Sequence, residues 1–241
     1  MVKANDGDMK EFFKTLSGFI WPIDCAGCSI RLQPGSIPAC QNCLRRIEKV
    51  DCEALVARMS YKGLTTSHWR KVFALWVFDK RGLVQSLHHT WKYGGGINLG
   101  FQLGVYLGRA LCTQQLIDPV SPGCEALIPV PLSNARYIER GYNQSMILSR
   151  GVASVTGQRL IADGLIRKKQ TRSQVGLSMK KRKENVQNAF AVRHRDTFYG
   201  KHIWLVDDVV TTGATLWAAT IPLIQAGALS VSILTLSAAR V

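Results

Sequence analysis

The chain has 241 residues, 46% of them apolar, which is enough to bury the core of one medium-sized domain and a small accessory one. No apolar run approaches the roughly 20 residues that a membrane-spanning helix needs, and the amino-terminal residues mix acids with bases without a small-residue cleavage site, so we expect a cytoplasmic protein with no transmembrane segment. With 31 Lys and Arg against 16 Asp and Glu, the chain has a formal net charge of +15. A charge of this size attracts polyanions, so it favours a nucleic acid or a phosphorylated ligand as the partner.

Two cysteine pairs come first in the chain, Cys25-x2-Cys28 and Cys40-x2-Cys43. Each C-x2-C turn can present two thiolates to a tetrahedral zinc ion, and four sulfur ligands leave no open position for substrate, so the pattern predicts a structural Zn²⁺ site. The alternative is a pair of disulfides, which a cytoplasmic chain disfavours. The remaining cysteines stand alone and are expected to pack as small hydrophobes: Cys52, Cys112 and Cys124.

Strand and helix patterns alternate after the cysteines. Apolar runs bounded by turn residues predict buried strands at 71–78, 125–130, 202–207 and 231–236. Helical patterns lie between them, near 98–112, 143–156 and 212–226. This alternation predicts an α/β fold with a mainly parallel sheet flanked by helices. We expect an amino-terminal domain over residues 1–60 and an α/β domain over 61–241, although no clear signal marks the boundary.

The stretch "IWLVDDVVTTGATL", residues 203–216, joins the carboxyl end of a predicted strand to the start of a predicted helix, which is where ligands bind in such sheets. Backbone N–H groups of this turn, with Gly213 at positive φ, can converge on a phosphate at the positive end of the helix dipole. Two carboxylates would repel a phosphate alone, so the ligand must also carry hydroxyl donors or a divalent cation. Because adjacent strand side chains face opposite ways, we expect the turn to begin between Asp207 and Asp208. A simple helix-capping pattern is the alternative.

A basic window extends from Arg167 to Arg195 and holds ten Lys or Arg against the single acid Glu184. Its net charge of +9 is more than half of the excess of the whole chain. A solvated loop and helix face would explain such a run, but its concentration favours an anionic partner.

The strand, acid pair and Thr–Gly turn resemble the 5-phosphoribosyl 1-pyrophosphate (PRPP) signature of type I phosphoribosyltransferases. The resemblance implies that Asp207 and Asp208 hold the ribose hydroxyls, that Mg²⁺ accompanies PRPP, and that the turn holds the 5-phosphate. The turn residues carried over are Thr211, Thr212, Gly213, Ala214 and Thr215.

Four further features resemble the ComF/GntX family, in the same order along the chain. They are the cysteine pairs, "WKYGG" (91–95), "LIPVPLSNARYIERGYNQSMILSR" (127–150) and "RSQVGLSMKKRKENVQNAF" (172–190). The resemblance implies a type I phosphoribosyltransferase fold fused to a small zinc ribbon with four cysteine ligands. The competence branch of that family is associated with natural transformation and handles single-stranded DNA as it enters the cytoplasm.

The resemblance also implies two roles for basic residues. The Pro129–Pro131 turn, which contains Val130, would form the pyrophosphate loop, with Arg136 and Arg140 beside the diphosphate, although "RGYN" (140–143) equally suits a turn and helix cap. Arg182 lies where relatives carry a loop that closes over the reacting centre. The alternative is that the basic window follows a DNA backbone, through Arg167, Lys168, Lys169, Arg172, Lys180, Lys181, Arg182 and Lys183.

Two hypotheses of different classes remain. The first is a DNA-uptake protein that binds single-stranded DNA on its basic surface and uses its PRPP pocket as a regulatory or vestigial site. The second is an active phosphoribosyltransferase that transfers ribose 5-phosphate to an unidentified base or amine. A weaker third hypothesis makes the zinc ribbon a docking module for an uptake helicase or an inner-membrane DNA channel, which would place the protein at the inner face of the membrane.

Overall fold

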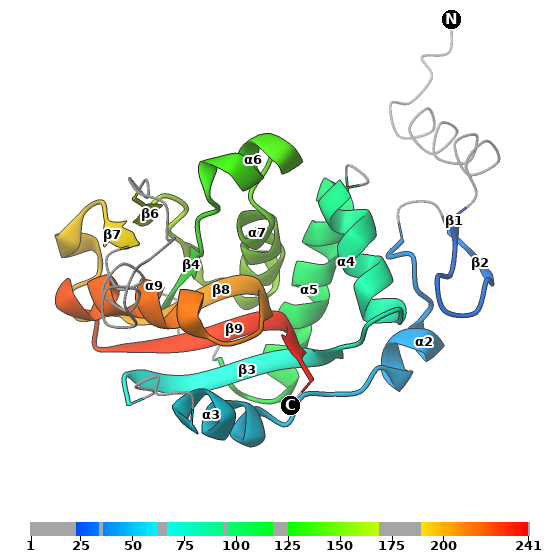
Figure 1. Ribbon diagram of the computed structural model, residues 1–241, viewed down its shortest axis with the longest axis horizontal. Helices are drawn as coiled ribbons and strands as arrows, with labels where there is room; N and C mark the ends of the chain where they lie inside the picture. Colours follow the sequence, from blue (N-terminus) through cyan, green and yellow to red (C-terminus); the bar gives the residue numbers. More distant parts are fainter. Residues whose placement is uncertain are drawn as a thin grey trace, which may run out of the picture.

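The computed structural model describes residues 23–33, 36–61, 67–93, 96–117, 125–168 and 189–240. Its centre is a five-stranded sheet, in the order β3-β9-β8-β4-β5, in which every neighbouring pair is parallel (Figure 1). The strands are β3 (Trp69–Phe78), β4 (Glu125–Pro129), β5 (Arg159–Leu160), β8 (His202–Val210) and β9 (Ser230–Ala239). The central strand β8 therefore has paired neighbours on both sides, as a strand buried on both faces requires.

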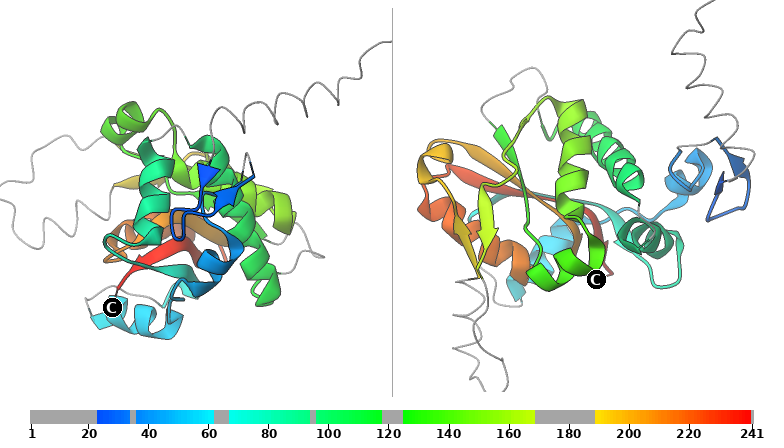
Figure 2. Two further views of the ribbon diagram at one scale, coloured as in Figure 1. Left: turned by 90° about the vertical axis from the view of Figure 1, so that its right-hand side faces the viewer. Right: turned by 90° about the horizontal axis from the view of Figure 1, so that it is seen from above.

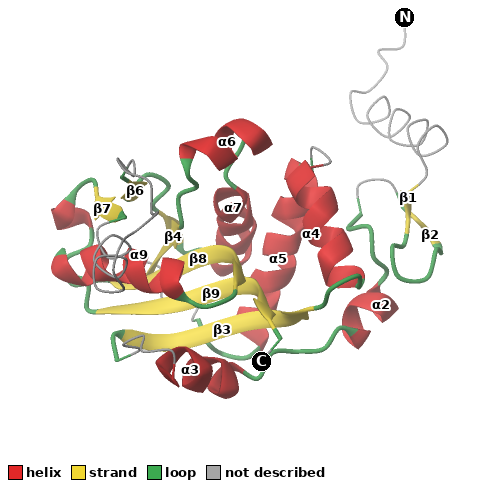
Figure 3. Cartoon of the chain, viewed as in Figure 1, coloured by secondary structure: helices red, strands yellow, loops and turns green. Residues whose placement is uncertain are grey.

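Helices cover both faces of this sheet (Figure 3). One face carries α4 (Leu83–Tyr93), α5 (Ile97–Thr113) and α7 (Gln144–Thr156), and the other carries α3 (Cys52–Tyr61) and α9 (Ala214–Gln225). Alternate residues of β8 divide between the two cores: Trp204 packs with the first group of helices, whereas Ile203 and Leu205 pack with the second. The predicted fold class, a mainly parallel sheet flanked by helices with an amino-terminal cluster of four cysteines, is confirmed.

Smaller elements lie outside the main sheet. The cysteine segment lies at one end and the β6–β7 hairpin at the other (Figure 2). These elements are β1 (Ile23–Asp24), β2 (Arg31–Leu32), α2 (Gln41–Arg46), α6 (Asn134–Arg140), β6 (Leu165–Arg167), β7 (Phe190–Val192) and the 3-10 turn η1 (Arg195–Thr197). Among the described helices, none has both the length and the apolar character that crossing a bilayer would demand.

Two glycines let α5 and α7 touch backbone to backbone. A methyl group on Gly104 would collide with the carbonyl oxygen of Leu148, and one on Gly151 would collide with the carbonyl oxygen of Phe101. This close contact holds α7 firmly against α5. The first turn of α7 is consequently held in place beside the carboxyl end of β8.

The turn after β8 begins later than we expected. The prediction that it starts between Asp207 and Asp208 is wrong, because β8 continues to Val210. The neighbouring strand β9 continues alongside it, pairing Thr235 with Asp207 and Ala238 with Val210, so the ladder extends past both acids.

Cys52 is the next cysteine along the chain after the two pairs. It is half-buried at the start of α3, with its Sγ 3.8 Å from the carbonyl oxygen of Ala74. Cys112 is half-buried in α5, and Cys124 lies outside the described residues. Because α3 packs on the sheet, buried side chains of residues 52–61 belong to the main core. The domain division at residue 60 stays a prediction.

Candidate functional site at the carboxyl end of β8

Two adjacent carboxylates at the end of β8 are each bound by a different helix. The hydroxyl of Ser145, in the first turn of α7, donates to Asp207 Oδ1 at 2.9 Å, and the backbone N–H of Asp208 donates to the same oxygen at 2.9 Å. Lys92 Nζ, from the last turn of α4, lies 2.6 Å from Asp208 Oδ2. The Lys92 and Asp208 side chains are only 15% and 13% exposed, so this ion pair is largely shielded from solvent.

The two carboxyl groups have different affinities for a proton. Burial, together with the neighbouring charge of Asp208, raises the pKa of Asp207 to about 7. Burial also acts to raise the pKa of Asp208, but the Lys92 ammonium outweighs it and lowers that pKa below its usual value. Burial lowers the pKa of the nearby His88 to about 4, so its ring is neutral at pH 7. Near neutrality the pair therefore carries between one and two negative charges, partly balanced by Lys92.

This arrangement predicts a pH-dependent effect of Asp207→Asn on stability. The folded-state pKa of Asp207 lies above its unfolded value of about 3.9, so ionisation opposes folding: the cost is absent at low pH, grows as pH rises through 4 to 7 and is constant above. The amide oxygen of asparagine can accept the same hydrogen bonds without ionising. Asp207→Asn should therefore raise the free energy of unfolding relative to the parent chain. In urea unfolding, this increase should be larger at about pH 8 than at about pH 4.5, by more than about 1 kcal/mol. A gain that is equal at both pH values, or larger at the lower one, would contradict the raised pKa.

The Thr–Gly turn lines the same hollow as the first acid. Asp207 and the residues from Val209 to Leu216 enclose a cavity of about 40 Å³. Gly213 adopts a φ of 80°, as its proposed role in the turn requires, and forms the N-cap of α9 without a side-chain capping bond. Thr211 and Thr212 are exposed, and the Thr212 hydroxyl accepts weakly from the Ala214 N–H at 3.4 Å. The turn, the amino end of α9 and Asp207 can thus contact one small ligand together.

One arginine from α6 and one from β6 lie near the acid pair. The guanidinium of Arg140 donates from Nη1 to Gln144 Oε1 at 3.0 Å and contributes to the lowered pKa of Asp208. Burial lowers the pKa of Arg167, and the Arg136 charge nearby lowers it further while Asp207 opposes both. Arg140 and Arg167 therefore lie near the two carboxylates, and Arg136 lies near Arg167. This combination suits a ligand with both anionic and hydroxyl groups.

The segment after β4 supports this rim. Val130 is buried and Pro131 half-buried, and the Asn143 side-chain amide donates to the Val130 carbonyl oxygen at 3.0 Å. Arg140 Nε and Gln144 Nε2 are buried and have no hydrogen-bond partner within the described part of the chain. Buried donors without a partner are uncommon, and these two could donate to an oxygen of a bound ligand.

Most of the predicted DNA-contacting residues lie outside the described residues. Only Arg167 and Lys168 can be placed, at the end of β6, where the Lys168 N–H donates to the Ala189 carbonyl oxygen at 2.8 Å. The others are Lys169, Arg172, Lys180, Lys181, Arg182 and Lys183. The two ends of the basic window are thus joined at the β6–β7 hairpin, close to Arg136.

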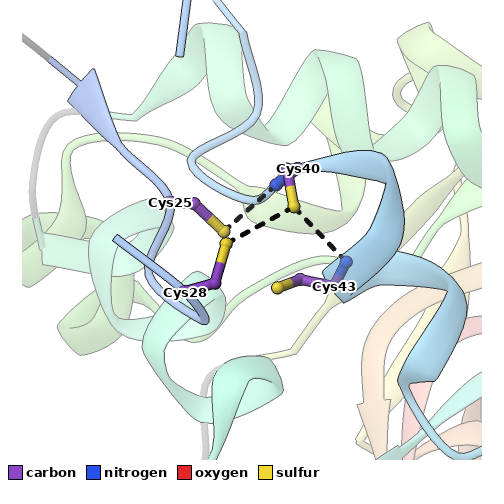
Figure 4. Close-up of side chains that lie close together, drawn as sticks. All are labelled: Cys25, Cys28, Cys40 and Cys43. Carbon is purple, nitrogen blue, oxygen red and sulfur yellow. Dashed lines mark hydrogen bonds between the residues drawn. The ribbon is translucent and has the colours of Figure 1, made fainter. Parts of the chain in front are cut away.

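The four paired cysteines form a separate cluster (Figure 4). Their Sγ atoms all lie within 4.8 Å of one another, and Cys28 Sγ is 3.7 Å from Cys40 Sγ. A tetrahedron with Zn–S bonds of 2.3 Å has an edge of about 3.8 Å, so this spacing fits a zinc ion. Although burial raises the pKa of Cys25, N–H groups of Cys40 and Gly27 lower it to about 6, which favours the thiolate that a metal needs. The cluster could hold a metal ion such as zinc.

Fold and site together define a parallel α/β protein with an acid pair and a Thr–Gly turn at the end of its central strand and a distant four-cysteine cluster. No protein-family model matches the chain. It is similar to competence protein F of Haemophilus influenzae, with 42% identity over 93 residues, 38% of this chain and 41% of the relative. It is also similar to the DNA utilization protein YhgH of Salmonella typhi, with 33% identity over 135 residues, 55% of this chain and 59% of the relative. The predicted resemblance to the ComF family is confirmed by these homologues, of whose length the chain spans about half.

Solved structures that are similar to part of this chain include the following two. One is described as the allosteric regulatory enzyme of purine biosynthesis, with a TM-score of 0.40, 23% identity and coverage of 58% of this chain and 26% of that one. The other is the glutamine PRPP amidotransferase of B. subtilis complexed with ADP and GMP, with a TM-score of 0.40, 24% identity and coverage of 57% and 26%.

Proposed function

We propose that this protein serves DNA utilization of the competence type: it handles incoming single-stranded DNA in the cytoplasm and binds PRPP with Mg²⁺ at the end of β8. The observation that carries the proposal is the meeting of Asp207, Asp208 and the Thr–Gly turn toward one end of the central strand, with Arg140 and Arg167 nearby. The relatives named for competence and DNA utilization support the DNA role, as does the net charge of +15.

In this proposal each part of the site contacts a different part of PRPP. The carboxylates accept hydrogen bonds from the ribose hydroxyls, and the turn from Thr211 to Thr215 donates N–H and hydroxyl groups to the 5-phosphate. Arg136 and Arg140, next to the Val130–Pro131 segment, contact the diphosphate. Mg²⁺ bound to the diphosphate would offset its charge beside the acids.

The four-cysteine cluster has a structural role in this proposal. Cys25, Cys28, Cys40 and Cys43 would hold one Zn²⁺ and leave it no open position for chemistry. We propose that residues 1–60 form the zinc-bearing domain and residues 61–241 the PRPP-binding domain. An uptake helicase or an inner-membrane DNA channel is the partner that the zinc-bearing domain would contact, at the inner face of the membrane.

The second candidate function is phosphoribosyl transfer from PRPP to an unidentified base or amine. The specific observation in its favour is the number of cations near the acid pair, namely Lys92, Arg140 and Arg167. Fixed positive charge of this kind stabilises a departing diphosphate more than a bound one. Release of pyrophosphate in the presence of a nucleobase would favour this candidate over a purely regulatory pocket.

Binding of labelled single-stranded DNA across a salt series, with and without PRPP and Mg²⁺, tests the proposal. We expect the logarithm of the affinity to fall linearly with the logarithm of salt, by about 0.7 for each phosphate contacted. We also expect PRPP with Mg²⁺ to change the affinity, and the same addition to have no effect on the Asp207→Asn, Asp208→Asn variant. Absence of DNA binding, with PRPP still bound, would contradict the DNA role and favour the transferase.

A further inference from the structure

Helix α6 is well formed but stands out from the described body of the protein. The Ser133 hydroxyl accepts from the Arg136 N–H at its start, and Gly141, at a φ of 76°, ends it. Of the described α-helices, α6 alone buries none of its side chains. Ile138 is 83% exposed and Tyr137 is 53% exposed, and Figure 1 shows the helix projecting from the body beside α7. A helix without a buried face contributes little to the core, so its apolar side chains call for another role.

The ends of α6 are anchored to the site already described. Asn143 bonds back to Val130, Arg140 bonds to Gln144, and the Tyr142 hydroxyl donates to the Trp91 carbonyl oxygen. The helix is therefore held in a defined position at the edge of the acid pair. A surface presented in this way can bind a partner without first becoming ordered.

Cations alternate with exposed rings on and around this helix. The Arg140 guanidinium lies 5.9 Å from the centre of the Tyr93 ring, and Tyr93 is 55% exposed. Arg136 on α6 acts on Arg167 at the end of β6, so the two charges are neighbours in space. The helix itself carries a single acid, Glu139. Positive charge for phosphates next to flat apolar surface for bases is the combination that binds single-stranded nucleic acid.

We propose that the exposed face of α6, together with Tyr93 and Arg167, binds single-stranded nucleic acid at the mouth of the acid-pair site. The inference rests on the proposed DNA role and assigns it a surface. Arg136 and Arg167 contact phosphates, Tyr137 and Tyr93 stack on bases, and Ile138 packs against a base or sugar. Lys168 continues this surface along the hairpin.

This position couples the strand to the pocket. The diphosphate of PRPP would draw on Arg136 and Arg140, the same cations that lie beside the strand. PRPP should therefore weaken strand binding, and by thermodynamic reciprocity the strand should weaken PRPP binding by the same factor. The proposal thus gives the sign of the PRPP effect.

The test compares two exposed surfaces of the full chain. The Tyr137→Ser, Ile138→Ser variant should bind labelled oligothymidine about 5- to 100-fold more weakly, with an unchanged salt slope, because it loses stacking and no charge. Arg136→Ala should reduce the salt slope by about 0.7. Tyr199→Ser is the matched control, because Tyr199 is 78% exposed and lies just before the amino end of β8. Helix α6, in contrast, follows the carboxyl end of the neighbouring parallel strand β4. The Tyr199→Ser variant should bind oligothymidine as the parent chain does.

Each other outcome has a definite meaning. If the parent chain binds oligothymidine but the α6 variants bind equally well, or if Tyr199→Ser causes the loss, the α6 surface is wrong and the DNA role stands. If the parent chain binds no single-stranded DNA, the DNA role and the α6 surface both fall. If Ile138→Ser instead dissociates a dimer in sedimentation and leaves DNA binding unchanged, the face belongs to a second copy of the chain and the proposal is overturned.

Discussion

A chain carrying both Asp207→Asn and Asp208→Asn should lose PRPP binding while keeping its binding of single-stranded DNA. Each carboxylate is proposed to accept hydrogen bonds from the ribose, and a hydrogen bond to a charged group contributes about 1.5–3 kcal/mol. Asparagine loses the negative charge and replaces one acceptor oxygen with an NH2 donor, so one charge-assisted hydrogen bond is lost at each position. Loss of two such bonds corresponds to a reduction in affinity of more than about 100-fold. Calorimetric titration with PRPP and Mg²⁺, beside DNA binding at one fixed salt concentration, measures both quantities.

Two further variants keep this prediction testable. Asp163→Asn is the control for loss of an acid, because the Asp163 side chain is 69% exposed and pairs only loosely, at 3.7 Å, with Arg193. It should bind PRPP normally. The double variant leaves Lys92 without its partner in a shielded place, so Lys92→Met added to it removes the unpaired charge if folding suffers. Equal loss of PRPP and DNA binding in a folded double variant would mean that DNA binding also depends on the acid pair, and would contradict the prediction.

The parallel sheet could be predicted from the sequence because its strands and helices leave local signals. The four longer strands are continuous apolar runs, and the three predicted helices agree with α5, α7 and α9 within a few residues. The end of β8 could not be predicted in this way. The local sequence at Asp207 and Asp208 predicts the start of a turn. The pairing of β8 with the last residues of β9, which local sequence does not indicate, extends the strand to Val210.

The partners of the two acids were missed for a related reason. Lys92 and Ser145 both lie inside segments that resemble the ComF/GntX family. Neither residue type, however, indicates that its side chain will contact an acid distant in the sequence. No helix is predicted over residues 83–93, and only the packing of α4 and α7 on one face of the sheet brings Lys92 and Ser145 to β8. The exposure of α6 is equally invisible locally, because "NARYIER" has the composition of an ordinary surface helix.

Removal of the metal is the second change for which we expect a large effect. It should lower the stability of the cysteine segment and leave the α/β core folded. The purified chain should contain one zinc ion, and a strong chelator should lower the thermal stability of the cysteine segment, since metal binding contributes directly to the folding of such segments. The α/β core should persist, because most residues of its two apolar clusters come from the sheet and its flanking helices; Cys25, Ala39 and Leu44 are the buried residues that the cysteine segment adds to the second cluster. Metal analysis and thermal unfolding followed by circular dichroism check both statements.

Two substitutions separate loss of the metal from loss of the fold. Cys40→Ser removes one ligand but keeps a side chain that can cap α2, as the Cys40 sulfur now does by accepting from the Cys43 N–H at 3.5 Å. Gly27→Ala keeps all four thiols, yet its methyl group would lie 2.8 Å from Cys43 Sγ and push that ligand away. Both should lower zinc affinity, Cys40→Ser by more than the roughly 10- to 100-fold that loss of an outer-shell partner costs. Cys112→Ser, in α5 and outside the four-cysteine cluster, should keep its zinc. A chain that contains no zinc and unfolds identically with and without chelator would show that the four thiols pack without a metal.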